Sequence, residues 1–314
     1  MITIPVRVCG DSWVNPAEVE SLLESHSNEQ YIILDFQAEG PSLRALGIAD
    51  YLERYCAKFN RDPKTISLTN ISNQVEQFEL PYANLNYLRL SHFFGMSKTY
   101  WKDQWPAPTH EYKFGFFLGR RTISRAKILY DLWHNFKQES LLSCMKTPVP
   151  LPWTVNTQVQ DVEKLDHWVN NPEEFTAWWA NCPVSSLDNH WVQDQYIQNP
   201  TTNKDILDHY HRFDVELVAE SYTLGNTFFP TEKTVRPIMA VKPFIVYGPR
   251  QFLQRLRDMG FKTYSEFWDE SYDELEGPAR WQAITNLLPQ INYDPSTNLV
   301  AEFNRAHLGK IIQK

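Results

Sequence analysis

The segment Phe213–Gly248 constrains the fold most strongly, because it contains two apolar, β-type runs separated by a loop and the start of a helix. The first run, Val215–Ala219, ends at an acid, Glu220, and the second run, Pro243–Tyr247, ends at Gly248. Two strands joined through a helix form a βαβ unit with parallel strands. The loop after the first strand and the first helical turn then lie at the carboxyl edge of the sheet, where α/β proteins bind ligands.

The predicted helix start has the chemistry of an anion site. Pro230 and Thr231 open the helix, and Thr231 is a suitable N-cap. Free backbone N–H groups and the positive end of the helix dipole favour an anion there, and Lys233 adds a full charge. Glu232 complements the helix dipole. Because the acid Glu220 could hold sugar hydroxyls beside this cationic turn, the segment predicts a site for a nucleotide-linked sugar.

The same residues resemble the donor-site signature of α1,3-fucosyltransferases. Those enzymes carry an acid-Asn-Ser, a short loop, Thr-Glu-Lys and a Pro-x-x-x-Gly strand end. This chain has Glu220-Ser221, Thr231–Lys233 and a similar strand end, Pro243–Gly248, with four residues between the proline and the glycine. The chain departs from the family at Ser221, where Asn is usual, and at Pro237, which is predicted to interrupt the helix. The resemblance implies that Glu220, Thr231, Glu232 and Lys233 bind the donor.

A second patch lies about a hundred residues upstream, in the order that the family has. It consists of a strand-like run Lys113–Leu118, a turn with Arg120 and Arg121, and a predicted helix over Thr122–Phe136 that contains Arg125. The resemblance implies that Arg125 contacts the donor diphosphate, and Arg120 and Arg121 supply further positive charge there. The alternative for Arg125 is an ordinary charge on a helix surface.

The order of the elements predicts an α/β fold with two Rossmann-like domains facing each other across a cleft, the architecture called GT-B in glycosyltransferases. Residues 1–108 would form the acceptor domain, and residues 109–314 the nucleotide-sugar domain with a C-terminal helical extension. The proline-rich segment Trp105–Pro108 separates them. The first domain is predicted to alternate strands and helices over Ile4–Cys9, Asn15–Ser25, Tyr31–Phe36, Leu43–Lys58 and Thr65–Thr69.

Composition and missing motifs restrict the classes of function that the chain can have. The formal net charge of −8 does not favour nucleic acid, and the chain has neither an apolar run of 18 residues nor a signal-peptide pattern, so we expect a cytoplasmic protein without membrane contact. Gly-x-Gly-x-x-Gly, the P-loop motif and Asp-x-Asp are all absent. Four scattered cysteines predict neither a disulfide framework nor a zinc site. These patterns predict a metal-independent enzyme without a cofactor, in which Arg, Lys and helix N–H groups neutralise the departing diphosphate.

An inverting transfer also needs a base that takes the proton of the acceptor hydroxyl. Asp11 and Glu39 follow the first two predicted strands and are the candidates, and His92 is a third. The alternatives are a cap or turn residue for Asp11 and a loop carboxylate for Glu39.

Other functions stay open. Gly10-Asp11-Ser12 resembles the first block of SGNH/GDSL esterases, and the segment Asp208–His211 provides their Asp-x-x-His, which would make Ser12 a nucleophile. The pair His209 and His211 beside Asp208 is also a weak candidate for a metal site. A third alternative is a non-catalytic sugar-binding protein.

The sequence therefore predicts a glycosyltransferase that uses a nucleoside-diphosphate sugar. The family resemblance points to GDP-fucose as the default donor and to inversion at the sugar carbon. The acceptor would be a glycan, a protein, a small molecule or, in a viral type of enzyme, a modified DNA base.

Overall fold

The chain divides into two compact α/β units. The computed structural model describes residues 1–9, 12–36, 43, 47–71, 83–87, 105–119, 122–144, 165–187, 204–220, 223, 228 and 230–312. Unit 1 comprises Met1–Phe93 with Leu224–Phe229, and unit 2 comprises Phe94–Thr223 with Pro230–Lys314. Each unit has its own four-stranded parallel sheet, which confirms the α/β class and the two Rossmann-like units. The boundary expected between residues 108 and 109, and the cleft, remain predictions.

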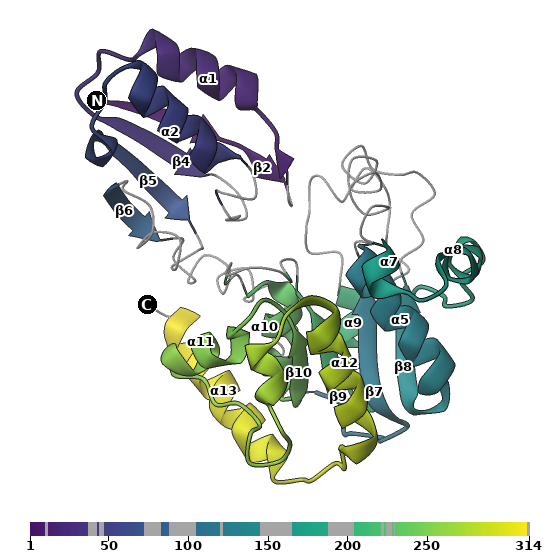
Figure 1. Ribbon diagram of the computed structural model, residues 1–314. Helices are drawn as coiled ribbons and strands as arrows, with labels where there is room; N and C mark the ends of the chain where they lie inside the picture. Colours follow the sequence, from purple (N-terminus) through teal and green to yellow (C-terminus); the bar gives the residue numbers. More distant parts are fainter. Residues whose placement is uncertain are drawn as a thin grey trace. The chain divides into compact units, whose positions relative to one another are not determined.

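In unit 1 the strands lie in the sheet in their order along the chain. The sheet order is β1-β4-β5-β6, with bounds Ile2–Val6, Ile32–Phe36, Ile66–Ile71 and Ala83–Tyr87 (Figure 1). The helices α1, Pro16–Ser25, and α2, Ile48–Lys58, connect the first three of these strands. The two connections that contain α1 and α2 are right-handed crossovers that run in the same direction across the sheet. Both helices therefore cover the same face of the sheet. A short antiparallel pair, β2 (Val8–Cys9) and β3 (Ser12–Trp13), follows β1.

The core of unit 1 explains why its elements were predictable. The strands β1 and β4 carry buried Ile, Leu, Val and Phe side chains at alternate positions, and α2 presents Leu52 to them. The helix over Asn15–Ser25 is confirmed, with Asn15 at its N-cap. The predicted start of the next helix at Leu43 is wrong: α2 begins at Ile48, because Gly47 has φ = 72°, outside the helical region.

Unit 2 has the strand order β10-β9-β7-β8, which is visible in Figure 1. The bounds are Tyr112–Leu118 for β7, Ser140–Cys144 for β8, Phe213–Ala219 for β9 and Phe244–Tyr247 for β10. The connection from β7 to β8 runs in one direction across the sheet, and the connection from β9 to β10 runs in the other. The order therefore reverses between the neighbouring strands β7 and β9.

Helices cover both faces of this sheet. Those of eight residues or more are α5 (Ile123–Asn135), α8 (Pro172–Ala180), α10 (Glu232–Met239), α12 (Gly277–Leu287) and α13 (Thr297–Ile312). Shorter ones are α7 (Leu165–Trp168), α9 (Lys204–Leu207) and α11 (Phe252–Asp258). Single 3-10 turns lie at Pro63–Thr65 in unit 1 and at Lys137–Glu139, Ser271–Glu274 and Leu288–Gln290 in unit 2. Right-handed crossovers in opposite directions put α5 and α10 on opposite faces, where α12 packs against α5 and α13 against α10.

One prediction from the sequence is corrected in unit 2. The helix after Lys233 is not interrupted at Pro237: α10 continues to Met239, and the proline removes only the one hydrogen bond that its N–H would have donated to the Lys233 carbonyl. Two elements occur where the sequence predicted none: the strand β6 in unit 1, and the helix α8 in unit 2, which is capped by Asn171 through the Glu174 N–H.

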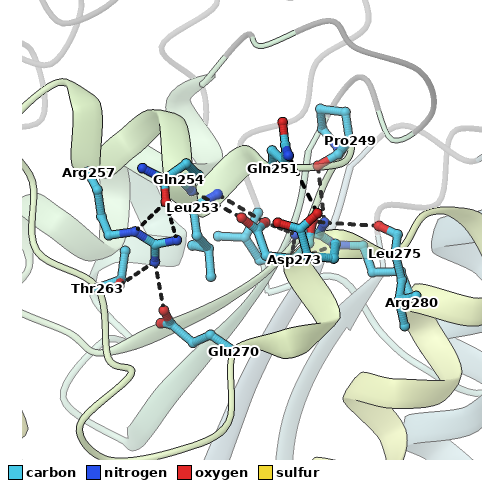
Figure 2. Close-up of polar contacts among 12 residues, drawn as sticks. Pro249, Gln251, Leu253, Gln254, Arg257, Thr263, Glu270, Asp273, Leu275 and Arg280 are labelled. Carbon is cyan, nitrogen blue, oxygen red and sulfur yellow. Dashed lines mark hydrogen bonds and ion pairs between the residues drawn. The ribbon is translucent and has the colours of Figure 1, made fainter.

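A buried arginine ties the carboxyl end of β10 to the elements that follow it. Arg280, on α12, is fully buried and donates to the carbonyls of Val246, Pro249, Asp273 and Leu275 (Figure 2). It also forms an ion pair with Asp273, from Nη2 to Oδ1 at 2.8 Å. The Asp273 carboxylate in turn accepts the first N–H groups of α11, from Leu253 and Gln254, and so caps that helix.

The middle of β7 requires a glycine. A Cβ on Gly115 would lie 2.8 Å from the ring of Phe213 on β9, closer than real carbon contacts allow. We expect Gly115→Ala to destabilise unit 2 by about 1–3 kcal/mol, because the ring or the strand must shift. The matched control is Gly119→Ala at the end of the same strand, where a Cβ meets no atom of the described residues within 4 Å. Thermal unfolding of both variants measures the difference, and equal melting temperatures would contradict the prediction.

Candidate functional site

The candidate site lies at the carboxyl edge of the sheet in unit 2, where the strand order reverses. The ends of β7 and β9 are neighbours there, since the two strands pair in parallel. The helix α5 begins just after β7, with Thr122 as N-cap, and α10 begins after the loop that follows β9, with Thr231 as N-cap. Because these helices lie on opposite faces, both of their N-termini are directed at the reversal point, which is where open α/β sheets bind ligands.

Glu220 connects both helix starts to the end of β9. Its side chain is fully buried, and its carboxylate accepts three hydrogen bonds from the start of α10: from Thr231 N (3.0 Å), Thr231 Oγ1 (2.6 Å) and Thr234 Oγ1 (2.5 Å). Its own N–H donates to the Tyr247 carbonyl of β10. The carboxylate that was expected to hold sugar hydroxyls is therefore directed at the helix that it caps.

Arg125 reaches the same residue from the other side. It lies in the first turn of α5, is 3% exposed, and its Nη2 donates to the Glu220 carbonyl at 2.6 Å. A surface charge on a helix, which was the alternative for this residue, does not describe a buried guanidinium. The two patches that the sequence singled out, a hundred residues apart, are thus in direct contact.

The first turn of α10 carries the cation that the sequence predicted, together with its own internal counter-ion. Lys233 Nζ forms an ion pair with Glu232 at 2.7 Å and contacts Thr231 Oγ1 at 3.2 Å. Burial alone would raise the pKa of Glu232, but the positive charges of Lys233 and Arg236 outweigh it and lower this pKa to about 2. An incoming anion would therefore compete with an ionised carboxylate for Lys233.

Beneath this turn lies a buried charge network that sequence reasoning missed. Glu216, in the middle of β9, is 1% exposed; it accepts from Tyr210 Oη at 2.6 Å and pairs with Arg236 of α10 at 3.3 Å. Burial raises the pKa of Glu216 to about 7, and Arg236 and the Tyr210 hydroxyl offset only part of that rise. A signal was present in the sequence: an acid inside an apolar strand needs a buried partner, and the next helix contains an arginine.

Lys242, which directly precedes the Pro243–Gly248 part of the signature, lies at the opposite edge of the sheet. It precedes β10, and its Nζ donates to the Phe213 carbonyl at the start of β9 at 2.6 Å. Burial lowers its pKa to about 8, partly opposed by the charge of Asp214. Because this edge of the sheet is distant from the carboxyl-edge site, the role of Lys242 is structural.

Several predicted site residues lie outside the described residues. These are the candidate bases and the turn arginines: Asp11, Glu39, His92, Arg120 and Arg121. Ser12 lies in β3 of unit 1, whereas Asp208 and His211 follow α9 in unit 2. In the described parts of the chain, no group of three His, Cys, Asp or Glu side chains could hold a metal ion, and no helix there has the length and apolar character to cross a membrane.

Comparisons with known proteins show distant similarity to solved structures. No family model matches the sequence, and no curated protein matches it. Among solved structures, the chain is similar to an α,α-trehalose-phosphate synthase (UDP-forming) from Burkholderia vietnamiensis, with 11% sequence identity and a TM-score of 0.40 over 93% of this chain and 68% of that one. The assignment of the site therefore comes from this chain's own residues.

Proposed function

We propose that the chain is a glycosyltransferase that binds a nucleoside-diphosphate sugar at the start of α10 and transfers the sugar to a hydroxyl acceptor. The observation that carries the proposal is the contact between Arg125 and Glu220, which joins the starts of α5 and α10 at the point where the strand order reverses. Ligand sites of open α/β sheets occur at such points. Helix N-termini and fixed cations there suit a diphosphate, whose charge grows as the sugar departs.

Each residue of the site has a proposed part. Lys233 would exchange its partner Glu232 for a phosphate oxygen, which frees the Glu232 carboxylate to accept hydrogen bonds from hydroxyls of the donor. Arg125, with the turn residues Arg120 and Arg121, would supply positive charge to the diphosphate. Glu220 and Thr231 would act by holding the helix start in position.

The donor, the acceptor and the base are proposed from the sequence. The resemblance to α1,3-fucosyltransferases favours GDP-fucose as donor, inversion at the sugar carbon and a reaction without a metal ion or a cofactor. Asp11 and Glu39 are the proposed bases. A glycan, a protein, a small molecule or a modified DNA base would accept the sugar, in the cytoplasm.

Replacing Lys233 with alanine tests the donor site. We expect Lys233→Ala to weaken binding of the preferred nucleoside diphosphate by about 1.5–3 kcal/mol, which is about 10- to 150-fold in Kd, because a charge-assisted contact is lost. A thermal-shift panel of GDP, UDP, ADP, CDP and dTDP, without metal and then with Mn²⁺, identifies that diphosphate, since a ligand of the native state raises its stability. Calorimetric titration then measures its Kd.

The matched control for this experiment is Lys310→Ala, which removes an exposed lysine from α13. It should leave the Kd unchanged. If none of the five diphosphates stabilises the protein, or if Lys233→Ala and Lys310→Ala bind them equally well, the donor site is not at α10.

The esterase hypothesis makes the opposite prediction for Ser12. An esterase would hydrolyse an activated acyl ester such as p-nitrophenyl acetate, lose this activity in Ser12→Ala and ignore nucleoside diphosphates. For a transferase, Ser12→Ala should leave sugar transfer largely intact. A non-catalytic sugar-binding protein would bind a nucleotide sugar without hydrolysing or transferring it, which product analysis distinguishes.

A further inference from the structure

The residues beneath the start of α10 form a line of alternating charge. Glu216 of β9 pairs with Arg236 at 3.3 Å, and Lys233 pairs with Glu232 at 2.7 Å. Arg236 follows Glu232 by four residues on α10, so the two side chains are on one face of the helix, and the positive charge of Arg236 helps to lower the pKa of Glu232. The line runs from the middle of the sheet to the turn where we place the diphosphate.

The charges in this line cancel when Glu216 is ionised. Two carboxylates then balance Arg236 and Lys233, and the line offers an anion no net attraction. When Glu216 takes up a proton, one positive charge is left over, and it lies on the helix whose N-terminus faces the ligand. Because Arg236 is 4% exposed, little water screens that charge.

We propose that Glu216 and Arg236 are positioning residues that set the anion affinity of the α10 start, so that a nucleotide sugar binds more tightly once Glu216 is protonated. The inference rests on the proposed function of this site. It assigns a role to a buried acid that neither binds the donor nor reaches solvent.

The surroundings of Glu216 put its protonation near neutral pH. Burial raises its pKa to about 7, and Glu220, just after the end of the same strand, raises it slightly, whereas Arg236 and the Tyr210 hydroxyl lower it. On the neighbouring strand β7, the ring of Phe117 stacks on Tyr210 at 5.8 Å between ring centroids and lies under Arg236 at 5.9 Å, and the charged residue Lys113 pairs with Glu139 at 3.8 Å. Since this pKa is raised, the carboxyl group is neutral below about pH 7 and charged above it, and donor affinity should fall as the pH rises through 7.

The experiment measures the Kd of GDP-fucose by calorimetry from pH 5.5 to 8.5. Both phosphates of GDP-fucose lack a second ionisable hydroxyl and keep one charge each over this range, so the charge of the diphosphate does not change with pH. We expect the Kd to be about tenfold lower at pH 6 than at pH 8. An effect of this size is typical of one unit charge in a partly buried site that acts on a bound anion without touching it. Glu216→Gln, which mimics the protonated acid, should bind with the tight Kd at both values.

A second variant keeps the test decisive if Glu216→Gln does not fold. Tyr210→Phe removes the hydroxyl that donates to Glu216 at 2.6 Å, so the pKa of Glu216 should rise and the midpoint of the binding curve should move to higher pH. A purely structural role for Tyr210 would change the Kd without moving the midpoint. Whatever pH dependence remains in Glu216→Gln comes from other groups of the protein.

The outcomes separate this inference from the function on which it rests. A Kd that does not change with pH in the natural protein, or that changes equally in Glu216→Gln, would overturn the inference and leave the donor site standing. Absence of binding by GDP-fucose at every pH, together with no thermal shift from any of the five diphosphates, would overturn both.

Discussion

Replacing Arg280 with methionine should destabilise unit 2 by about 3–5 kcal/mol, because it leaves the buried carboxylate of Asp273 without its counter-ion. The side chain is fully buried and donates to four carbonyls as well as to Asp273. Methionine fills most of the volume but satisfies none of these acceptors. Differential scanning calorimetry should show the transition of unit 2 at a lower temperature and that of unit 1 unchanged.

Two further variants test whether the lost stability comes from the buried, uncompensated charge of Asp273. Arg250→Ala breaks an ion pair of the same kind with Glu274, but this pair is exposed, with 55% of the Arg250 side chain accessible, and its loss should cost less than about 1 kcal/mol. Combining Arg280→Met with Asp273→Asn removes the uncompensated charge, so the double variant should recover part of the lost stability. If Arg280→Met is no less stable than Arg250→Ala, the buried pair does not hold unit 2 together.

Arg280 illustrates what the sequence could not reveal. Its neighbours on α12, Ala279 and Trp281, do not identify a partner for it, and that partner, Asp273, belongs to a 3-10 turn that has no pattern of its own. What makes the pair buried is its position under the end of β10, which depends on how three segments pack. For Glu216 the sequence does signal a buried partner, but its pairing with Arg236 also requires α10 to lie on β9.

The elements that were predicted correctly are specified by residues within them or directly next to them in the sequence. Pro16 after Asn15 marks the start of α1, Thr231 marks the start of α10, and the apolar runs of β4, β9 and β10 are long enough to be strands in any context. The strand β8 gave no such signal, because the short sequence SLLSC follows a helix directly and becomes a strand only by pairing with β7. The two ligand-site patches were found separately, but only the sheet order explains why they meet.

Replacing Glu220 with alanine should have the second large effect, on stability and on donor binding together. The variant removes the acceptor for three buried donors, Thr231 N, Thr231 Oγ1 and Thr234 Oγ1, and each buried donor without a partner costs about 1–3 kcal/mol. Because the two hydroxyls can rotate towards other acceptors, we expect a total loss of about 3–5 kcal/mol in the stability of unit 2. Thr234→Val removes one donor while keeping the shape of the side chain, and it should cost about 1 kcal/mol.

Glu220→Gln separates a positioning role from direct contact with the sugar. Glutamine keeps the volume and the oxygen that accepts from Thr231 N and Thr234 Oγ1, but it places an NH2 donor against Thr231 Oγ1. Because this hydroxyl already accepts from Lys233 N and Nζ, the start of α10 should shift while the protein still folds. If Glu220 acts by positioning, GDP and GDP-fucose should both bind about tenfold more weakly, because the turn that carries Lys233 has moved. If Glu220 instead bound hydroxyls of the transferred sugar, GDP would bind the variant normally and only GDP-fucose would lose affinity. The three hydrogen bonds already made by the carboxylate favour the first result, since a sugar hydroxyl would have to displace a donor that caps the helix.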